Sequence, residues 1–203
     1  MADASRPWNR RAQLCADVYT NPGRTNRDGI EYATSGTGRA RTFAICGTNG
    51  ARDWLYNLAA NRITVPGMGR VHVGFFVAMQ KTLRDFLTYT NDKPTDLVGH
   101  SQGAAVALIL AVYVSVMIPD GRKRLGELCA VAPPRVGDGT FGDVFRTYFD
   151  RASCRLYTRD YDLVTKVPRG RGWQHPTETV ELHSPIDFRF DHSIDDYIGL
   201  IDE

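Results

Sequence analysis

A serine held between two glycines is the strongest chemical signal in the chain, in the run G-H-S-Q-G at residues 99–103. Apolar residues precede this run and a long apolar stretch follows it, so the pattern predicts a strand, a sharp turn and a helix. Glycine permits the strained backbone of such a turn, which leaves the Ser101 hydroxyl exposed. A serine hydroxyl becomes a nucleophile beside a base, usually a histidine that a carboxylate orients.

Two of the five histidines precede or adjoin Ser101, which leaves His175, His183 and His192 as possible bases. His192 follows a strand-like run and directly precedes the last expected helix, the position where a strand–turn–helix nucleophile receives its base. We therefore expect His192 to be the base, with His183 as the alternative. His175 is expected to make a structural hydrogen bond.

The acid that orients this base is expected among the aspartates after the strand at residues 154–157. Asp160 and Asp162 both lie at the carboxyl end of that strand, where sites gather in open α/β sheets. Asp162 precedes an apolar pair that would anchor it against the core, whereas Asp160 has the character of a solvated turn residue. Asp162 is therefore the favoured acid.

An oxyanion formed during acyl transfer needs two backbone N–H donors. The residue after the nucleophile, Gln102, can supply one of them. The expected strand at residues 41–46 runs into Gly47 and Thr48, where glycine allows a tight turn and Thr48 can offer the second N–H. The alternative is an ordinary turn without this role.

Residues 51–68 combine apolar and charged side chains in a way that suits a cover over the site. The apolar members that could contact an acyl chain are Trp54, Leu55, Leu58 and Val65, together with Ile63 and Met68. Such a segment is compatible with a lid that opens at a lipid–water interface or with a fixed flap over a soluble ester. The alternative is an amphipathic helix packed on the core.

Strands and helices alternate along the chain, which predicts an α/β fold with a mostly parallel sheet. Helices are expected at residues 10–19, 53–60, 74–89, 104–118, 140–149 and 194–201. Strands are expected at residues 30–34, 41–46, 97–98, 128–132, 154–157 and 180–182. No repeat, linker or change of composition divides the chain, so residues 1–203 are expected to form a single domain.

Composition argues against several functional classes. The chain has 203 residues and a net charge of +2, which gives no electrostatic case for nucleic acid. Its four cysteines are far apart, so we expect no metal site, while a disulfide stays open. The uncharged run at residues 104–118 is too short for a membrane span and predicts a buried helix. Residues 1–11 are polar and lack the apolar core of a secretory signal, which favours a cytoplasmic location.

Several motifs, in matching order, resemble those of the class 3 lipase family, the fungal-lipase-like α/β-hydrolases. The resemblance extends over most of the chain from about Phe43. The motifs are G-T-N at residues 47–49 before D-W-L at 53–55, V-H-V-G-F at 71–75, the serine turn at 99–103, A-P-P-R-V-G at 132–137, D-L-V and V-P within 162–168, and H with Y-I-G within 192–199.

This resemblance implies an α/β-hydrolase fold, a mostly parallel central sheet flanked by helices. It implies Ser101, Asp162 and His192 as a catalytic triad and the N–H groups of Thr48 and Gln102 as the oxyanion hole. No metal or organic cofactor is expected. The chain departs from the family pattern at Cys46, Gln102, Ala104 and Thr165, and none of these departures removes a catalytic group.

The expected activity is hydrolysis of carboxylic ester bonds in acyl lipids through an acyl-enzyme intermediate. The expected partner is therefore an ester or lipid substrate, met at a lipid–water interface or in solution. The alternatives are an esterase for small soluble esters and a lipase-like binding protein without catalysis. The sequence gives no indication of the oligomeric state.

Overall fold

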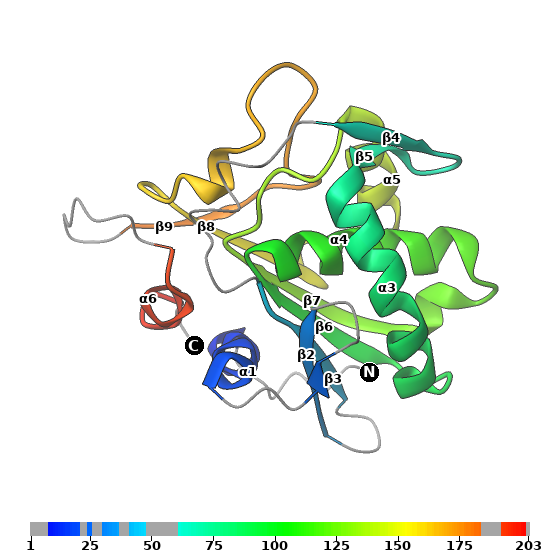
Figure 1. Ribbon diagram of the computed structural model, residues 1–203, viewed down its shortest axis with the longest axis horizontal. Coiled ribbons are helices and arrows are strands. Elements are labelled where there is room, and N and C mark those ends of the chain that lie inside the picture. The colour runs from blue at the N-terminus through cyan, green and yellow to red at the C-terminus, as the bar shows by residue number, and fades with distance from the viewer. Residues whose placement is uncertain are drawn as a thin grey trace.

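The computed structural model describes residues 8–20, 24–25, 30–36, 41–47, 61–183 and 192–201. Within these residues a seven-stranded sheet with the order β1-β2-β3-β6-β7-β8-β9 forms the centre of the molecule (Figure 1). The β1–β2 and β2–β3 pairs are antiparallel. The other pairs of this sheet, β3–β6, β6–β7, β7–β8 and β8–β9, are parallel. The strands are β1 (Arg24–Thr25), β2 (Glu31–Ser35), β3 (Thr42–Ile45), β6 (Thr95–His100), β7 (Leu125–Val131), β8 (Cys154–Arg159) and β9 (Val180–Leu182).

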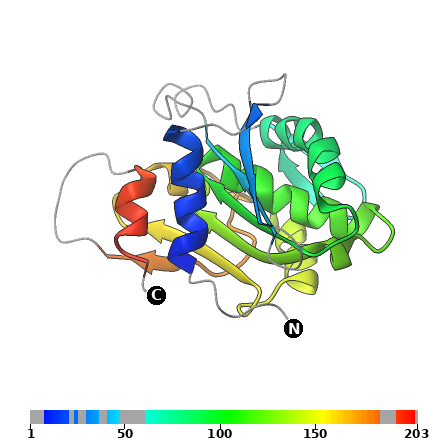
Figure 2. The same ribbon diagram turned by 90° about the horizontal axis from the view of Figure 1, so that it is seen from below.

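Helices cover both faces of this sheet. The first and last helices, α1 (Trp8–Thr20) and α6 (Ile194–Ile198), lie side by side on one face, as both views show (Figures 1 and 2). The other face carries α3 (Val73–Thr90), α4 (Gln102–Met117) and α5 (Gly139–Tyr148). Short 3-10 turns, η1 (Gly121–Arg124) and η2 (Val164–Lys166), follow α4 and β8. The mostly parallel sheet flanked by helices that the sequence predicts is thus confirmed.

Helix α4 lies at the centre of the larger core. It carries no charged residue, and most of its side chains are buried. A helix that is apolar on all sides needs cover on all sides, and the sheet together with α3 and α5 provides it. Among the described residues no helix is both long enough and apolar enough to span a membrane.

Helix α1 is held on the sheet by a buried charge cluster. Arg11 donates to Asp96 Oδ2 from Nε at 3.2 Å and from Nη2 at 3.1 Å, and Nη2 also contacts Glu127 Oε2 at 2.5 Å. The Arg11 side chain is buried, while both carboxylates keep partial contact with solvent. Burial of the guanidinium is tolerated because two carboxylates share its charge.

A hairpin occupies the second part of residues 51–68, the segment that the sequence predicts to cover the site. Residues 51–60 lie outside the described part of the chain, but β4 (Arg62–Val65) and β5 (Gly69–His72) form a separate antiparallel pair. Val65 is only 5 % exposed and Met68 is fully buried, both in the core beneath α3 and α4. Val65 thus lies in the core, while Ile63, two residues before it in β4, is 36 % exposed; contact of this segment with an acyl chain stays a prediction.

The cluster at Arg11 leads to a first prediction. Replacing Arg11 with Met keeps the length of the side chain but leaves Asp96 and Glu127 without their shared cation. Loss of one partner of a buried ion pair costs about 3–5 kcal/mol, so we expect a fall of about 3 kcal/mol in the free energy of unfolding, measured by urea denaturation. Arg10→Met, at an exposed position of the same helix, is the control and should change stability by less than about 0.5 kcal/mol. Equal stability of the two variants would contradict the role of this cluster.

Candidate active site

Ser101 adopts a backbone conformation that non-glycine residues rarely occupy. Its φ is 57° and its ψ is −125°, between the end of β6 and the first residue of α4. The Ser101 N–H donates to the Val131 carbonyl at 2.9 Å, and the Ser101 carbonyl accepts from the N–H of Ala104 at 3.1 Å. These bonds fix the serine at the apex of the strand–turn–helix arrangement that the sequence predicts.

Two glycines make this turn sterically possible. A Cβ on Gly99 would lie 2.6 Å from the Ala104 Cα, and a Cβ on Gly103 would overlap the Ile45 carbonyl oxygen. The first contact lets α4 start directly above β6, and the second lets α4 rest on the end of β3. Both positions therefore require glycine for close backbone approach rather than for a positive φ.

The structure brings Ser101, His192 and Asp162 into one line of hydrogen bonds. The Ser101 hydroxyl lies 2.7 Å from His192 Nε2, and His192 Nδ1 lies 2.7 Å from Asp162 Oδ2. With the ring proton on Nδ1, His192 donates to the carboxylate and accepts the serine proton on Nε2. The three residues come from three elements: the end of β6, the turn after β8 and the segment before α6.

The carboxylate of Asp162 is fully buried, with 0 % exposure, and several donors compensate its charge. Besides His192, the Tyr197 hydroxyl donates to Oδ2 at 2.7 Å and the Val164 N–H donates to Oδ1 at 2.9 Å. Burial and the neighbouring Asp162 charge raise the pKa of Tyr197, so its hydroxyl keeps its proton. A buried carboxylate with three donors is held in one orientation.

Two of the groups next to Ser101, Gln102 and Gly47, lie where the sequence predicts the oxyanion hole. Gln102 is the first residue of α4, and the amino end of a 16-residue helix carries partial positive charge beside the serine. Gly47 packs against the same serine, since a Cβ on it would lie 2.8 Å from Ser101 Cβ. Thr48 lies outside the described residues, as do the expected substrate contacts Trp54, Leu55 and Leu58.

The alternative candidates for acid and base lie elsewhere. His183 and Asp160 pair with each other at 2.8 Å on the surface, where neither approaches Ser101 through any described contact. His175 Nε2 donates to the Thr165 carbonyl at 3.0 Å, which is the structural hydrogen bond that the sequence predicts. His72 caps α3 by accepting from two backbone N–H groups of its first turn.

Two tyrosines beside the site received no role from the sequence. Tyr197 belongs to a segment singled out by its resemblance to a family motif, but its bond to Asp162 joins residues 35 positions apart. Tyr19 bonds His100, which is 81 positions away. No local pattern indicates such contacts, because they follow from the packing of α1 and α6 on the sheet.

The directions of the hydrogen bonds from Ser101 to His192 and from His192 to Asp162 determine what chemistry this arrangement can perform. A hydroxyl whose proton faces a neutral imidazole can attack an electrophilic carbon while that imidazole takes the proton. The buried carboxylate then faces the imidazolium that forms and stabilises it. The geometry therefore suits acyl transfer through a covalent serine intermediate.

Known proteins resemble this chain in sequence or in structure. The family model described as "Lipase (class 3)" matches residues 42–171. The secreted mono- and diacylglycerol lipase 3 of Gibberella zeae is 32% identical over 106 residues, which cover 52% of this chain and 32% of that protein. A secreted mono- and diacylglycerol lipase of Malassezia globosa is 29% identical over 170 residues, which cover 76% of this chain and 52% of that protein.

Among solved structures, lipase II from Rhizopus niveus superposes with a TM-score of 0.64 at 19% identity, covering 86% of this chain and 77% of that chain. This likeness confirms the α/β-hydrolase fold. The matched part of the chain spans about a third of the length of the first curated relatives.

The same comparisons overturn one expectation. The relatives are described as secreted, which points to an extracellular rather than a cytoplasmic location, so the cytoplasmic expectation is wrong. It rested on the polar character of the first residues, and that character does not report the route by which a protein leaves the cell.

The half-buried His175 leads to a prediction about pH. Burial is the main cause that lowers the pKa of His175 to about 4, whereas an unfolded histidine titrates near 6.5. Because protonation then favours the unfolded chain, this contribution is fully present above pH 6.5 and is lost as the pH falls towards 4. We expect unfolding free energies measured between pH 7 and 4 to fall less in His175→Gln than in wild type, by about 2 kcal/mol.

Glutamine at position 175 can keep the donor to the Thr165 carbonyl but does not titrate, so it isolates the effect of protonation. His183→Gln is the matched control, since Asp160 raises the pKa of that exposed histidine instead. Identical pH profiles for His175→Gln and wild type would contradict the prediction.

Proposed function

The chain belongs to the class 3 lipase family, and on this basis we propose that it hydrolyses carboxylic ester bonds of acyl lipids through an acyl-enzyme intermediate. The observation that carries the proposal is the unbroken line of hydrogen bonds from Ser101 through His192 to Asp162, with 2.7 Å at each step. A structural role alone would not require a buried charge aligned with a strained serine.

In the first half of the proposed reaction, Ser101 Oγ attacks the ester carbonyl carbon while His192 Nε2 takes the hydroxyl proton. Asp162 holds the Nδ1–H tautomer and stabilises the resulting imidazolium. The tetrahedral intermediate collapses as the carbon–oxygen bond to the alcohol breaks, and His192 returns the proton to the departing alcohol oxygen. The acyl group remains on Ser101.

The developing negative charge on the former carbonyl oxygen is proposed to lie against the N–H groups of Gln102 and Thr48. The position of Gln102 at the start of α4 supports this role, because the helix dipole favours an anion there. Thr48 follows Gly47, which packs against the nucleophile. In the second half, His192 activates a water that attacks the acyl carbon and releases the fatty acid and the free serine.

An acyl lipid substrate is supported first by the relatives that the sequence matches. Tyr161 and Leu163, the sequence neighbours of Asp162, are 50 % and 49 % exposed, and exposed apolar side chains suit contact with a lipid–water interface. The lipases with similar sequences are named for mono- and diacylglycerols, so we propose acylglycerols as substrates and action outside the cell.

Ser101→Ala tests this proposal. We expect kcat/KM for p-nitrophenyl butyrate to fall at least about 10³-fold, because alanine removes the nucleophile while the fold is kept. Ser115→Ala is the matched control: it removes a serine hydroxyl from α4 that donates to the Ala111 carbonyl, and its activity should equal wild type. Equal rates in wild type and Ser101→Ala, or no turnover in wild type, would contradict the proposal.

The dependence of activity on acyl-chain length distinguishes a lipid hydrolase from an esterase for small soluble esters. With a series of p-nitrophenyl esters from acetate to palmitate, a lipid hydrolase is expected to prefer medium or long chains and to gain activity above the solubility limit of the ester. A preference for acetate without such a gain would favour an esterase for small soluble esters. Both results would leave the role of Ser101 intact.

A further inference from the structure

The Tyr19 hydroxyl lies between the two segments that flank the nucleophile. It is 2.8 Å from the backbone nitrogen of Gly47, at the end of β3, and 2.7 Å from Nδ1 of His100, at the end of β6. The catalytic scheme proposed above does not use Tyr19 or His100. The contacts nevertheless place one oxygen atom of α1 in reach of both sides of Ser101.

The directions of these two bonds follow from the chemistry of the groups. An amide N–H can only donate, so the Tyr19 oxygen accepts from Gly47. The tyrosine proton is then left for His100 Nδ1, which accepts it and leaves the ring proton on Nε2. Burial raises the pKa of Tyr19 and lowers that of His100, which agrees with a protonated phenol that faces a neutral imidazole.

The Gly47 contact bears on the oxyanion side of the serine. The Gly47 backbone lies so close to the nucleophile that a Cβ there would meet Ser101 Cβ and the Tyr19 hydroxyl, each at 2.8 Å. Gly47 also directly precedes Thr48, the proposed second oxyanion donor. A hydrogen bond to the Gly47 N–H therefore restrains the backbone one residue before the Thr48 N–H, the proposed oxyanion donor whose position matters for the transition state.

The His100 contact bears on the base. The His100 and His192 rings have centroids 5.0 Å apart and an interplanar angle of 30°. A second cation at that distance would oppose the imidazolium that His192 becomes during acyl transfer. A donor that occupies His100 Nδ1 keeps the ring neutral, and burial acts in the same direction because it lowers the pKa of this histidine.

Helix α1 presents this hydroxyl from a fixed position. Cys15 Sγ donates to the Ile45 carbonyl at 3.7 Å, and Cys46 Sγ donates to the Cys15 carbonyl at 3.4 Å. One turn further on, Tyr19 makes the contacts with Gly47 and His100. Ile45, Cys46 and Gly47 at the end of β3 are thus all hydrogen-bonded to α1. They directly precede Thr48, the proposed oxyanion donor.

We propose that Tyr19 is a positioning residue for the hydrolytic reaction: its hydroxyl fixes the Gly47 backbone and the neutral tautomer of His100, and through them the two sides of Ser101. This inference rests on the proposed function, since it assigns Tyr19 a part in the same reaction.

Tyr19→Phe tests it, because phenylalanine keeps the ring and removes only the shared oxygen. We expect kcat for p-nitrophenyl butyrate to fall about 10- to 100-fold while KM changes less than twofold, since the lost contacts act on the transition state. Phenylboronic acid forms a tetrahedral adduct with the Ser101 oxygen as His192 takes the proton. Its inhibition constant should weaken in parallel with kcat.

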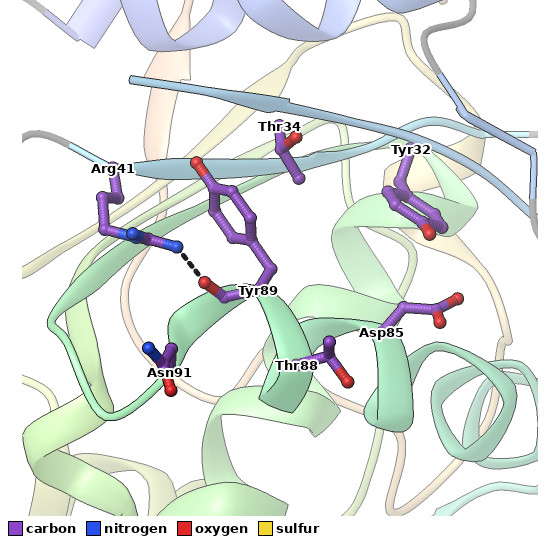
Figure 3. Close-up of a pocket in the computed structure, with 7 residues that line it drawn as sticks. All are labelled: Tyr32, Thr34, Arg41, Asp85, Thr88, Tyr89 and Asn91. Atoms are coloured by element: carbon purple, nitrogen blue, oxygen red, sulfur yellow. Dashed lines mark hydrogen bonds between the residues drawn. The ribbon is translucent and has the colours of Figure 1, made fainter. Parts of the chain in front are cut away.

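Tyr89→Phe is the matched control. It also removes one tyrosine hydroxyl, which donates to the Ser35 carbonyl at 2.9 Å at the far end of β2. Tyr89 lines a pocket of about 400 Å³ between β2 and the end of α3 (Figure 3). Ser35 pairs with Thr42, and Thr42 pairs with Asp96 at the end of β6 opposite to Ser101. We expect Tyr89→Phe to lose a similar amount of thermal stability and to keep wild-type kcat and boronate inhibition.

A wild-type kcat in Tyr19→Phe would overturn the inference, and so would equal losses of kcat in Tyr19→Phe and Tyr89→Phe. A rise in KM alone, with unchanged boronate inhibition, would also overturn it. These outcomes differ from failure of the proposed function, which would appear as wild-type protein without Ser101-dependent turnover.

Discussion

The conformation of Ser101 is the constraint on which the rest of the site depends. A φ of 57° combined with a ψ of −125° is costly for a residue with a Cβ, so surrounding contacts must hold it. These contacts are close backbone approaches: β6 contacts α4 at Gly99, and α4 contacts the end of β3 at Gly103. The apolar surface of α4 stabilises the turn because the helix cannot leave the core without exposing its whole length.

Burial of the polar groups is the second condition. Asp162 is fully buried and His192 is 7 % exposed, so each depends on hydrogen bonds that water would otherwise supply. The Tyr197 hydroxyl and the Val164 N–H donate hydrogen bonds to the carboxylate. His192 is hydrogen-bonded to both the carboxylate and the serine. A low-dielectric environment strengthens each of these bonds, and it also makes each partner necessary.

The sequence predicted the features that local physics determines. The glycines around Ser101 indicate the turn, and the uncharged run after it indicates a buried helix. The apolar pair that follows Asp162 and the position of His192 before the last helix favour these two residues over Asp160 and His183. It is less decisive where several local interpretations are equivalent. Val65 has the character of a lid residue and of a core residue alike, and its burial in the core follows from packing that no local pattern indicates.

Contacts made through α1 and α6 were beyond reach for a different reason. Parallel strands bring Ser101 and the turn with Asp162 to one edge of the sheet, so topology alone places two of the three groups. His192 precedes α6, and α6 is seated by its packing against α1 in the smaller core. The same α1 holds Gly47 and His100 through Tyr19. Both helices lie outside residues 42–171, the segment that the family model matches. The segment that the family model matches therefore contains the proposed nucleophile and acid, while the two flanking helices hold the proposed base next to them.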